Sequence, residues 1–190
     1  APHALVDTER GVNKTIYSNS SQAQDAYDDV NAFNSNGFQL KGQGNAGCSN
    51  YGQGSTTTAK YTSWTFRKQK GFFDIVTYTG TGVAGKTVSH SLGSVPGCIM
   101  IKKTNSSSES DWVVYHRSTG AGKKLYLNTN GAEASTSSWN SVTPTSSNFV
   151  LGLPENVNQY NDEFVAYVFA GGESTADTAR SVTFSSTGNN

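Results

Sequence analysis

The sequence carries little charge. Only 15% of its residues are charged, compared with about 25% in typical soluble domains. The 14 Lys and Arg residues are balanced by 14 Asp and Glu residues. No net field therefore attracts nucleic acid or an anionic membrane surface, and we expect neither partner.

Cysteine is scarce, with Cys48 and Cys98 as the only two. Two cysteines are too few for a disulfide scaffold. Cys98 lies in an apolar run and is expected to behave as a small buried hydrophobe. Cys48 lies in a Gly-rich stretch. We expect free thiols, with a disulfide between the two as the alternative.

Long apolar runs are missing as well. The longest, at 97–101 and 164–170, fall far short of the roughly 20 residues that a transmembrane helix needs. We therefore expect no membrane span.

Ser, Thr, Asn, Gly, β-branched and aromatic residues dominate instead, a composition that favours strands over helices. It is typical of an all-β protein of the extracellular space or of a virion, and we expect one of these locations. The sequence begins with Ala-Pro-His rather than Met. We interpret this start as a trimmed precursor or as part of a longer polypeptide.

The sequence repeats itself. Residues 5–21 align without a gap on residues 114–130, so that Gly11 meets Gly120 and Tyr17 meets Tyr126. After a gap of two residues in the first copy, residues 33–40 align on residues 144–151. Further along, residues 61–66 align on residues 164–169. Weak identity in one consistent order indicates a duplicated unit.

The repeat predicts the domain organisation. Residues 71–112 have no counterpart earlier in the sequence, whereas residues 181–188 resemble residues 75–82. We therefore expect three parts: a first unit without its front strands (1–70), a complete second unit (71–172) and a tail that resembles the first strand of a further unit (173–190). The predicted fold is two related antiparallel β-sandwiches, immunoglobulin-like or jelly-roll-like.

Hydrophobic periodicity places the elements. A helix is expected over residues 20–33, because its apolar residues share one helical face. Strands are expected near 4–8, 14–18, 58–67, 72–79, 86–90, 97–103, 111–116, 123–128, 148–153 and 163–170.

Residues 80–87, Gly-Thr-Gly-Val-Ala-Gly-Lys-Thr, fit the phosphate-binding P-loop pattern. A P-loop needs a helix immediately after it, so that the helix N-terminus faces the phosphate. Gly93, Pro96 and Gly97 follow instead, and they are incompatible with such a helix. We interpret the stretch as a hairpin loop between two antiparallel strands and expect no nucleotide cofactor.

No arrangement of residues predicts catalysis. His3, His90 and His116 lack metal-ligand spacing, and no Gly-x-Ser-x-Gly elbow is present. The acidic pairs Asp28–Asp29 and Asp162–Glu163 are adjacent in sequence and are expected to be solvated. We therefore expect a non-enzymatic protein without metal or cofactor; a weaker hypothesis places two carboxylates or a His–Asp pair in a deep pocket.

Exposed aromatic rings could form a sugar-binding platform. Trp64 and Tyr167 align within the repeat on apolar strands, so core packing is predicted for both. Tyr51 and Trp139 lie on polar segments and are predicted to be exposed. If both rings are exposed, an alternative hypothesis is that the protein is a module that binds host-surface glycans through them.

Four parts of the sequence carry a family resemblance: residues 61–103, 112–130, 139–152 and 164–170. In this order they resemble a repeat of uncharacterised phage tail and virion structural proteins, frequent in aquatic phages including cyanophages. The resemblance implies a β-rich building block of a tail or fibre. It implies no activity and no catalytic residues.

The incomplete first unit suggests how copies could assemble. A sandwich that lacks strands exposes an edge that pairs readily with another strand. Donor candidates lie near both ends of the sequence, namely Ala4, Leu5, Val6, Val182 and Phe184. Strand donation between copies would give a homo-oligomer or an open pilus-like filament. We therefore expect a structural subunit of an extracellular filament or phage tail fibre.

Overall fold

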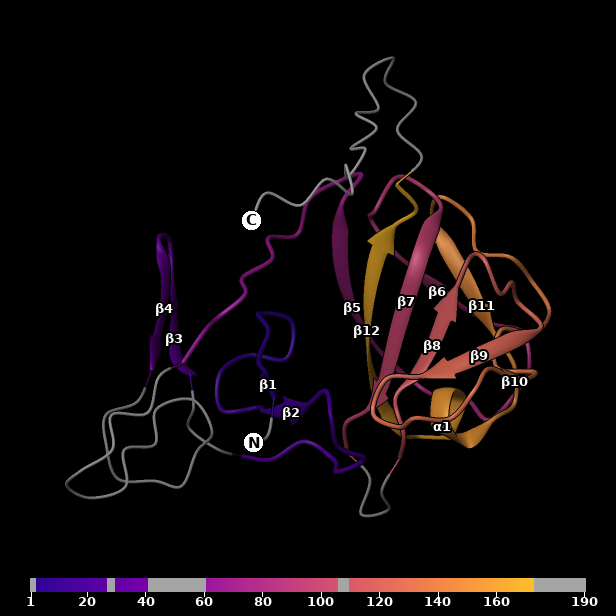
Figure 1. Cartoon of the computed structure of the whole chain (residues 1–190), viewed down its shortest axis with the longest axis horizontal. Helices are drawn as coiled ribbons and strands as arrows, with labels where there is room; N and C mark the ends of the chain where they lie inside the picture. Colours follow the sequence, from indigo (N-terminus) through magenta and orange to yellow (C-terminus); the bar gives the residue numbers. More distant parts are fainter. Residues whose placement is uncertain (1–2, 27–29, 41–60, 106–109, 173–190) are drawn as a thin grey trace, which may run out of the picture.

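The computed structural model describes residues 3–26, 30–40, 61–105 and 110–172. Their centre is an antiparallel sheet of six strands in the order β10-β9-β8-β7-β12-β5 (Figure 1). The strands are β5 (Phe73–Thr79), β7 (Pro96–Lys103), β8 (Val113–His116), β9 (Lys123–Tyr126), β10 (Ala134–Ser135) and β12 (Glu163–Ala170).

Strand β12 pairs with β5 on one side and with β7 on the other. Its sequence is apolar at almost every position because both faces of this strand are covered. Phe164, Ala166 and Val168 point into one core, whereas Val165 and Tyr167 point into another. The six-stranded sheet therefore lies between two apolar layers.

The first layer is a two-stranded sheet of β6 (Lys86–Ser89) and β11 (Asn148–Leu151). Val88, Phe149 and Leu151 from this sheet are buried against β7, β8 and β12. The short helix α1 (Glu155–Asn158) adds Val157 to the same core. This half of the molecule is a small β-sandwich.

The second layer comes from the N-terminal residues. Strands β1 (Ala4–Leu5) and β2 (Ile16–Tyr17) pair with each other and cover the opposite face of the sheet. Ile16 is fully buried there beside Trp112 and Tyr167. The described part of residues 1–26 therefore shares its hydrophobic core with the 71–172 unit. The predicted division at residue 70 stays a prediction, but these residues do not form a sandwich of their own.

The repeat is also a structural repeat. Leu5 pairs with Ile16 in the first copy, and their aligned residues Val114 and Leu125 pair in the second. Both hairpins close through a glycine with positive φ, 92° at Gly11 and 73° at Gly120. Each glycine donates its N–H to the carbonyl four residues earlier, at 3.0 and 3.1 Å.

The two copies differ in what surrounds them. Strand β4 (Gly37–Leu40) aligns with β11, but β4 pairs with β3 (Val30–Asn34), whereas β11 pairs with β6. The β3–β4 hairpin lies apart from the central sheet (Figure 1). Residues 71–112 supply β6 to the second copy.

Most of the predicted strands are confirmed, but the predicted helix over 20–33 is wrong. Within the described residues of that range, Asp25 bridges to Thr15, and β3 begins at Val30. Pairing with other parts of the chain therefore overrides the weak helix propensity of this stretch. The short helix α1, at 155–158, was not predicted. The strand expected at 58–67 is also wrong for its described residues, 61–67, which form no strand.

Candidate functional site: the exposed segment 61–67

Residues 61–67, which we name the exposed segment, connect the β3–β4 side of the molecule to β5 (Figure 1). All seven residues are solvent-exposed, and Trp64 is 82% exposed. Within the described part of the chain, no strand pairs with residues 62–67. Their backbone N–H and C=O groups can therefore accept another strand.

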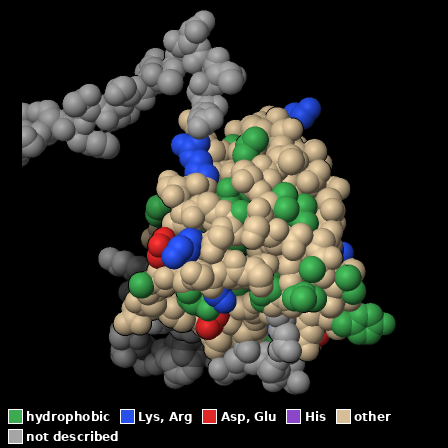
Figure 2. All heavy atoms as spheres, turned by 90° about the vertical axis from the view of Figure 1, so that its right-hand side faces the viewer, with side chains coloured by type: hydrophobic (Ala, Val, Ile, Leu, Met, Phe, Trp, Pro, Cys, Tyr) green, Lys and Arg blue, Asp and Glu red, His purple; other side chains and the backbone are tan. Residues whose placement is uncertain are grey.

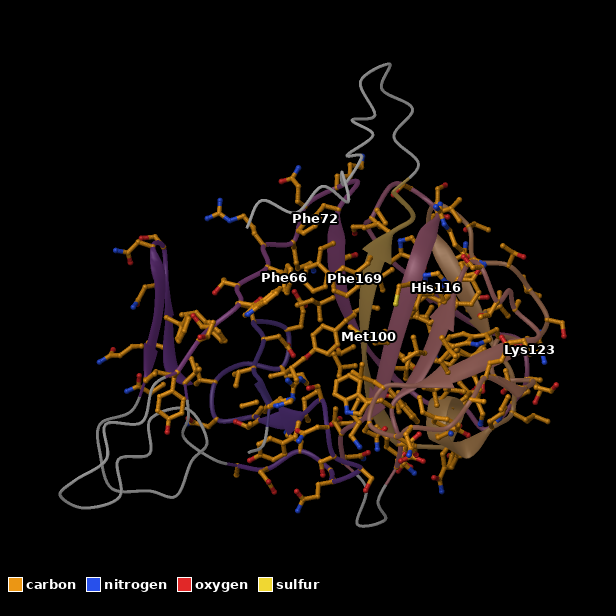
Figure 3. The ribbon with its side chains drawn as sticks, viewed as in Figure 1. Phe66, Phe72, Met100, His116, Lys123 and Phe169 are labelled. Carbon is orange, nitrogen blue, oxygen red and sulfur yellow. The ribbon has the colours of Figure 1, made fainter. Side chains whose placement is uncertain are left out.

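The C-terminal end of the exposed segment is anchored to the sheet. The ring of Phe66 lies 5.7 Å from that of Phe73 and 5.9 Å from that of Phe169, measured between centroids. Phe66, Phe72 and Phe169 lie together at one end of β5 and β12 (Figure 3). The chain then turns through Gln69, which bridges to Phe73 at the start of β5. The exposed segment therefore has a defined position beside the sheet.

Lys68 lies between this segment and the edge strand β5. Its ammonium group lies 2.9 Å from Glu9 Oε1 and 3.0 Å from Asp74 Oδ1, and it donates to the carbonyl oxygen of Ile75 at 3.2 Å. Lys68 precedes β5, but its ammonium group binds a carbonyl oxygen of that edge strand, and a charged group there opposes pairing of β5 with another chain.

The repeat shows which positions of β12 correspond to the exposed segment. Trp64 and Phe66 align with Tyr167 and Phe169 of β12, the strand that lies between β7 and β5. Tyr167 is buried as predicted, but Trp64 is not, so the prediction of core packing for Trp64 is wrong. Among the described residues no strand pairs with Trp64, whereas Tyr167 lies in a strand that is paired on both sides.

Of the donor candidates, Ala4 and Leu5 already pair with Tyr17 and Ile16 of the same chain. Val6, next to them, is half-buried. In the structure these residues therefore belong to a layer of their own molecule, and their donation to another copy stays a prediction. Val182 and Phe184 lie outside the described residues.

A buried ion pair holds this N-terminal layer to β12. Arg10 Nε donates to Asp7 Oδ2 at 2.7 Å, and both side chains are at least nine-tenths buried. The hydroxyl of Tyr167 donates to the same carboxylate oxygen at 2.7 Å. Burial raises the pKa of Tyr167 well above its usual value, so the hydroxyl keeps its proton.

Lys102 makes a second connection to the N-terminal layer. It is fully buried, and its ammonium group donates to the carbonyl oxygens of Ser21 and Ser110. The sequence predicts no role for Lys102 or Arg10. A lysine inside an apolar strand is normally expected to be exposed. The only signal was that Lys102 stands at a position of β7 that alternation places toward the N-terminal layer.

The prediction that Trp139 is exposed is wrong. Its ring is fully buried in the sandwich core, 5.5 Å from that of Tyr115 in an edge-to-face arrangement, and its indole N–H donates to the carbonyl oxygen of Lys123 at 3.0 Å. The polar residues around Trp139 form a turn, and this turn directs the ring inward. Tyr51 lies outside the described residues.

A polar hollow of about 300 Å³ lies beside β5. Asp74 and His90 both line this hollow, and they are the one aspartate and the one histidine among its lining residues. Asp74 is held by Lys68 and accepts the N–H of Ser91 at 2.6 Å. Burial alone would raise the pKa of Asp74, but the Ser91 N–H and Lys68 outweigh it, and the pKa is lowered. His90 Nδ1 accepts the N–H of Leu92 at 3.3 Å, so the His90–Asp74 geometry is not that of a catalytic pair.

The stretch 80–87 connects two different sheets. It links β5 in the central sheet to β6 in the smaller sheet, so the prediction of a hairpin is wrong, although a strand rather than a helix does follow it. Asn158 of α1 is fully buried and organises the loop. Its side-chain oxygen accepts the N–H of Thr81 at 2.8 Å, and its backbone carbonyl accepts the N–H of Gly82 at 2.8 Å. These N–H groups are therefore unavailable to a phosphate.

Metal and thiol chemistry find little support in the part of the chain that the structure describes. There, no three His, Cys, Asp or Glu residues are grouped closely enough to hold a metal ion. Cys98 is a free thiol whose pKa is raised by burial, which disfavours the reactive thiolate. Cys48 lies outside the described residues. No helix among the described residues is long and apolar enough to cross a bilayer.

One comparison with known proteins identifies the family. Residues 1–179 match the DUF7483 family, a domain of unknown function. The chain belongs to this family. A single family model therefore covers both copies of the repeat. The comparisons with curated proteins and with solved structures gave no match. The function of this DUF7483 protein must therefore be argued from its geometry.

Proposed function

We propose that this DUF7483 protein is a non-enzymatic structural subunit of an extracellular filament or phage tail fibre, and that it assembles through its repeated β-units. One observation carries the proposal: residues 62–67 have the sequence of a central strand but lack a partner strand in the described residues. An exposed, unpaired stretch of this kind can accept another strand by β-strand addition. Strand exchange between copies then links subunits through main-chain hydrogen bonds.

The surface chemistry supports a structural role. The formal net charge of zero, the Ser-, Thr- and Asn-rich composition and the lack of a convergent catalytic group in the described hollow all favour a building block over an enzyme. The resemblance to phage tail and virion proteins points the same way and remains part of this proposal.

The alternative is a module that binds surface glycans through Tyr51 and Trp139. Trp139 is buried and cannot contact a glycan. Apolar side chains on the face shown in Figure 2 are scattered among polar side chains and backbone, without an extended aromatic platform in that view. Trp64 at 82% and Tyr160 at 77% are the most exposed aromatic rings among the described residues, but neither was paired with Trp139 in that hypothesis. The fibre proposal is therefore better supported than the glycan alternative.

Electron microscopy of the full chain over a range of protein concentrations tests the proposal. We expect filaments that are lost in the Thr62→Pro/Thr65→Pro variant, because proline removes two backbone N–H donors from the exposed segment. The matched control is Thr62→Ala/Thr65→Ala, which retains both N–H groups and should retain the filaments. Monomers at every concentration, or filaments that persist in the proline variant, would contradict the proposal.

A further inference from the structure

The exposed segment and β5 are the two arms of an unfinished β-hairpin. The N–H of Gln69 donates to the carbonyl oxygen of Phe73 at 2.9 Å, and the N–H of Phe73 donates back to the carbonyl oxygen of Gln69 at 3.0 Å. The turn between them contains Gly71, whose φ is 74°. These two bonds form the first rung of an antiparallel ladder. Continued in the same register, the ladder would join residues 63–67 to residues 75–79.

The free edge of β5 has its backbone groups in the phase that this ladder needs. β5 is the last strand of the central sheet, with β12 on its other side (Figure 1). The N–H of Ala170 donates to the carbonyl oxygen of Phe72 at 2.9 Å, so the even-numbered residues of β5 bond to β12. Backbone groups alternate between the two sides of a strand, so those of Ile75, Thr77 and Thr79 point to the free edge.

The polar hollow of about 300 Å³ lies along this edge. It is lined by residues 75–77 of β5, by Glu9 from the N-terminal layer and by residues 89–91 at the end of β6. Its walls therefore come from the edge strand and from both layers that cover the sheet. A strand added to the edge of β5 would lie in this space.

Two side chains occupy the next rung of the ladder. In the register of the first rung, Arg67 lies opposite Ile75, and Lys68 lies opposite Asp74. Asp74 Oδ1 accepts the N–H of Ile75 at 2.9 Å, and the Lys68 ammonium group donates to the carbonyl oxygen of Ile75 at 3.2 Å. Lys68 and Asp74 also form an ion pair at 3.0 Å. Both outward backbone groups of Ile75 are therefore bonded to side chains and not to Arg67.

We propose that the free edge of β5 is a binding site for the chain's own residues 63–67, and that Lys68 and Asp74 hold this site open. Withdrawal of the lysine side chain frees the carbonyl oxygen of Ile75 for the N–H of Arg67. Closure then adds a seventh strand to the central sheet. The proposal concerns the isolated subunit and does not rest on the fibre assignment.

The ring of Phe66 separates the two states. It now lies 5.9 Å from the ring of Phe169, on the side of the N-terminal layer. In the closed ladder Phe66 lies opposite Val76, and Trp64 lies opposite Tyr78. Val76 and Tyr78 are half-buried residues of the sandwich side, so closure covers them with aromatic cross-strand neighbours. The ring cannot occupy both sides of the sheet, so the open and closed states exclude each other.

Disulfide trapping in the full chain at low micromolar concentration tests the proposal. Thr65→Cys and Thr77→Cys lie opposite each other in the closed register, where Cβ atoms come within about 5.5 Å. Both native cysteines are replaced by serine. We expect Lys68→Ala to raise the initial rate of intramolecular disulfide formation about fivefold, because one hydrogen bond to Ile75 no longer opposes closure.

Three controls accompany this pair. Lys70→Ala removes the lysine of the turn itself and should leave the rate unchanged. Trp64→Cys with Thr77→Cys places the two side chains on opposite faces and should lose most of the rate. Ser89→Cys with Asn148→Cys, a pair already opposed between β6 and β11, reports whether the sandwich stays folded in each background.

Amide hydrogen exchange supplies a second, independent readout. In the closed ladder the N–H groups of Thr65 and Arg67 bond to β5, whereas those of Trp64 and Phe66 point away from it. Lys68→Ala should therefore slow exchange at Thr65 and Arg67 and leave the other two amides unchanged. A loss of packing alone would not produce this alternation.

The outcomes separate the closed strand from other arrangements. Equal rates with and without Lys68, equal rates in both registers, or uniform exchange over residues 64–67 would overturn the proposal. Disulfide-linked dimers at low micromolar concentration would also overturn it, since they assign the edge of β5 to a neighbouring copy. Filament formation by the unmodified chain is a separate measurement, so the fibre assignment can fail while the closed strand is found, and the reverse.

Discussion

Single buried charges decide how the N-terminal layer is held. Asp7 and Arg10 neutralise each other beneath the β1–β2 layer, and Tyr167 connects the pair to the central strand β12. Arg10 also donates to the carbonyl oxygen of Lys14 at 2.8 Å and to Gln24 Oε1 at 2.9 Å. One guanidinium therefore connects several parts of an irregular segment to a regular sheet.

Arg10→Ala should be strongly destabilising, because it leaves the Asp7 carboxylate buried without its cation. We expect a loss of about 3–5 kcal/mol in the free energy of unfolding, measured by urea denaturation. Tyr167→Phe removes only the hydroxyl and should cost about 1–2 kcal/mol. Equal small losses for both variants would show that the ion pair does not hold the layer.

His90 should make stability depend on pH. Burial lowers the pKa of His90, an effect that the carbonyl of Thr145 and the charge of Asp74 only partly oppose. The unfolded chain therefore binds a proton at His90 at a higher pH than the folded chain does, so stability falls as the pH drops below the unfolded pKa of about 6.5.

Urea denaturation at pH 7.5 and pH 5.0 measures this effect. We expect the unmodified chain to lose stability at pH 5.0 and His90→Gln to lose less. Asp74 does not account for a difference in this window, because its lowered pKa keeps it ionised at both pH values. A variant with an unchanged pH dependence would contradict the assignment to His90.

At the scale of elements, the repeat shows that the same sequence pattern can be buried in one copy and exposed in the other. Trp64 and Tyr167 occupy equivalent positions, yet Trp64 is 82% exposed and Tyr167 only 5% exposed. The apolar pattern of a strand indicates that it can be buried on pairing. Whether it is buried depends on the presence of neighbouring strands.

This difference predicts unequal costs for equivalent substitutions. Tyr167→Ala should lower the free energy of unfolding by about 3–5 kcal/mol, as truncation of a large buried ring does. Trp64→Ala should change it by no more than about 0.5 kcal/mol, since the ring is exposed. Denaturation curves of the two variants give the comparison. A large loss for Trp64→Ala would mean that its ring is covered in solution.

Element prediction was most accurate where tertiary contacts and sequence pattern agree. Strands β5, β7, β11 and β12 were predicted within a few residues because their apolar runs are long or clearly alternating. The helix at 20–33 failed because Asp25 bridges to Thr15 and Val30 begins a strand that pairs with β4. The loop at 80–87 failed as a hairpin because pairing partners far apart in sequence, β11 for β6 and β12 for β5, outcompete local pairing.

At the scale of the whole molecule, the shared core makes the two halves interdependent. Ile16 and Leu5 from the N-terminal layer cover a sheet face that includes Ile75, Val165 and Tyr167. That face would be exposed if residues 71–172 were separated from the rest. A sheet with one uncovered apolar face is prone to association.

A chain of residues 71–172 alone should therefore not behave as a stable monomer. We expect it to aggregate or to bind a hydrophobic dye such as ANS, whereas a chain of residues 1–172 should do neither. Light scattering and dye fluorescence of the two fragments measure this. A soluble, cooperatively unfolding monomer of residues 71–172 would instead support two independent domains.

The sequence by itself determined the all-β class, the order of the main strands and the internal repeat, because alternation, turn residues and self-similarity are local or can be read by alignment. Only the tertiary structure decided that Trp139 is buried, that Trp64 is exposed and that Lys102 and Arg10 hold the N-terminal layer. Those outcomes depend on which distant strands become neighbours. Burial is a property of that neighbourhood, since the same apolar strand is a core element with partners beside it and an exposed segment without them.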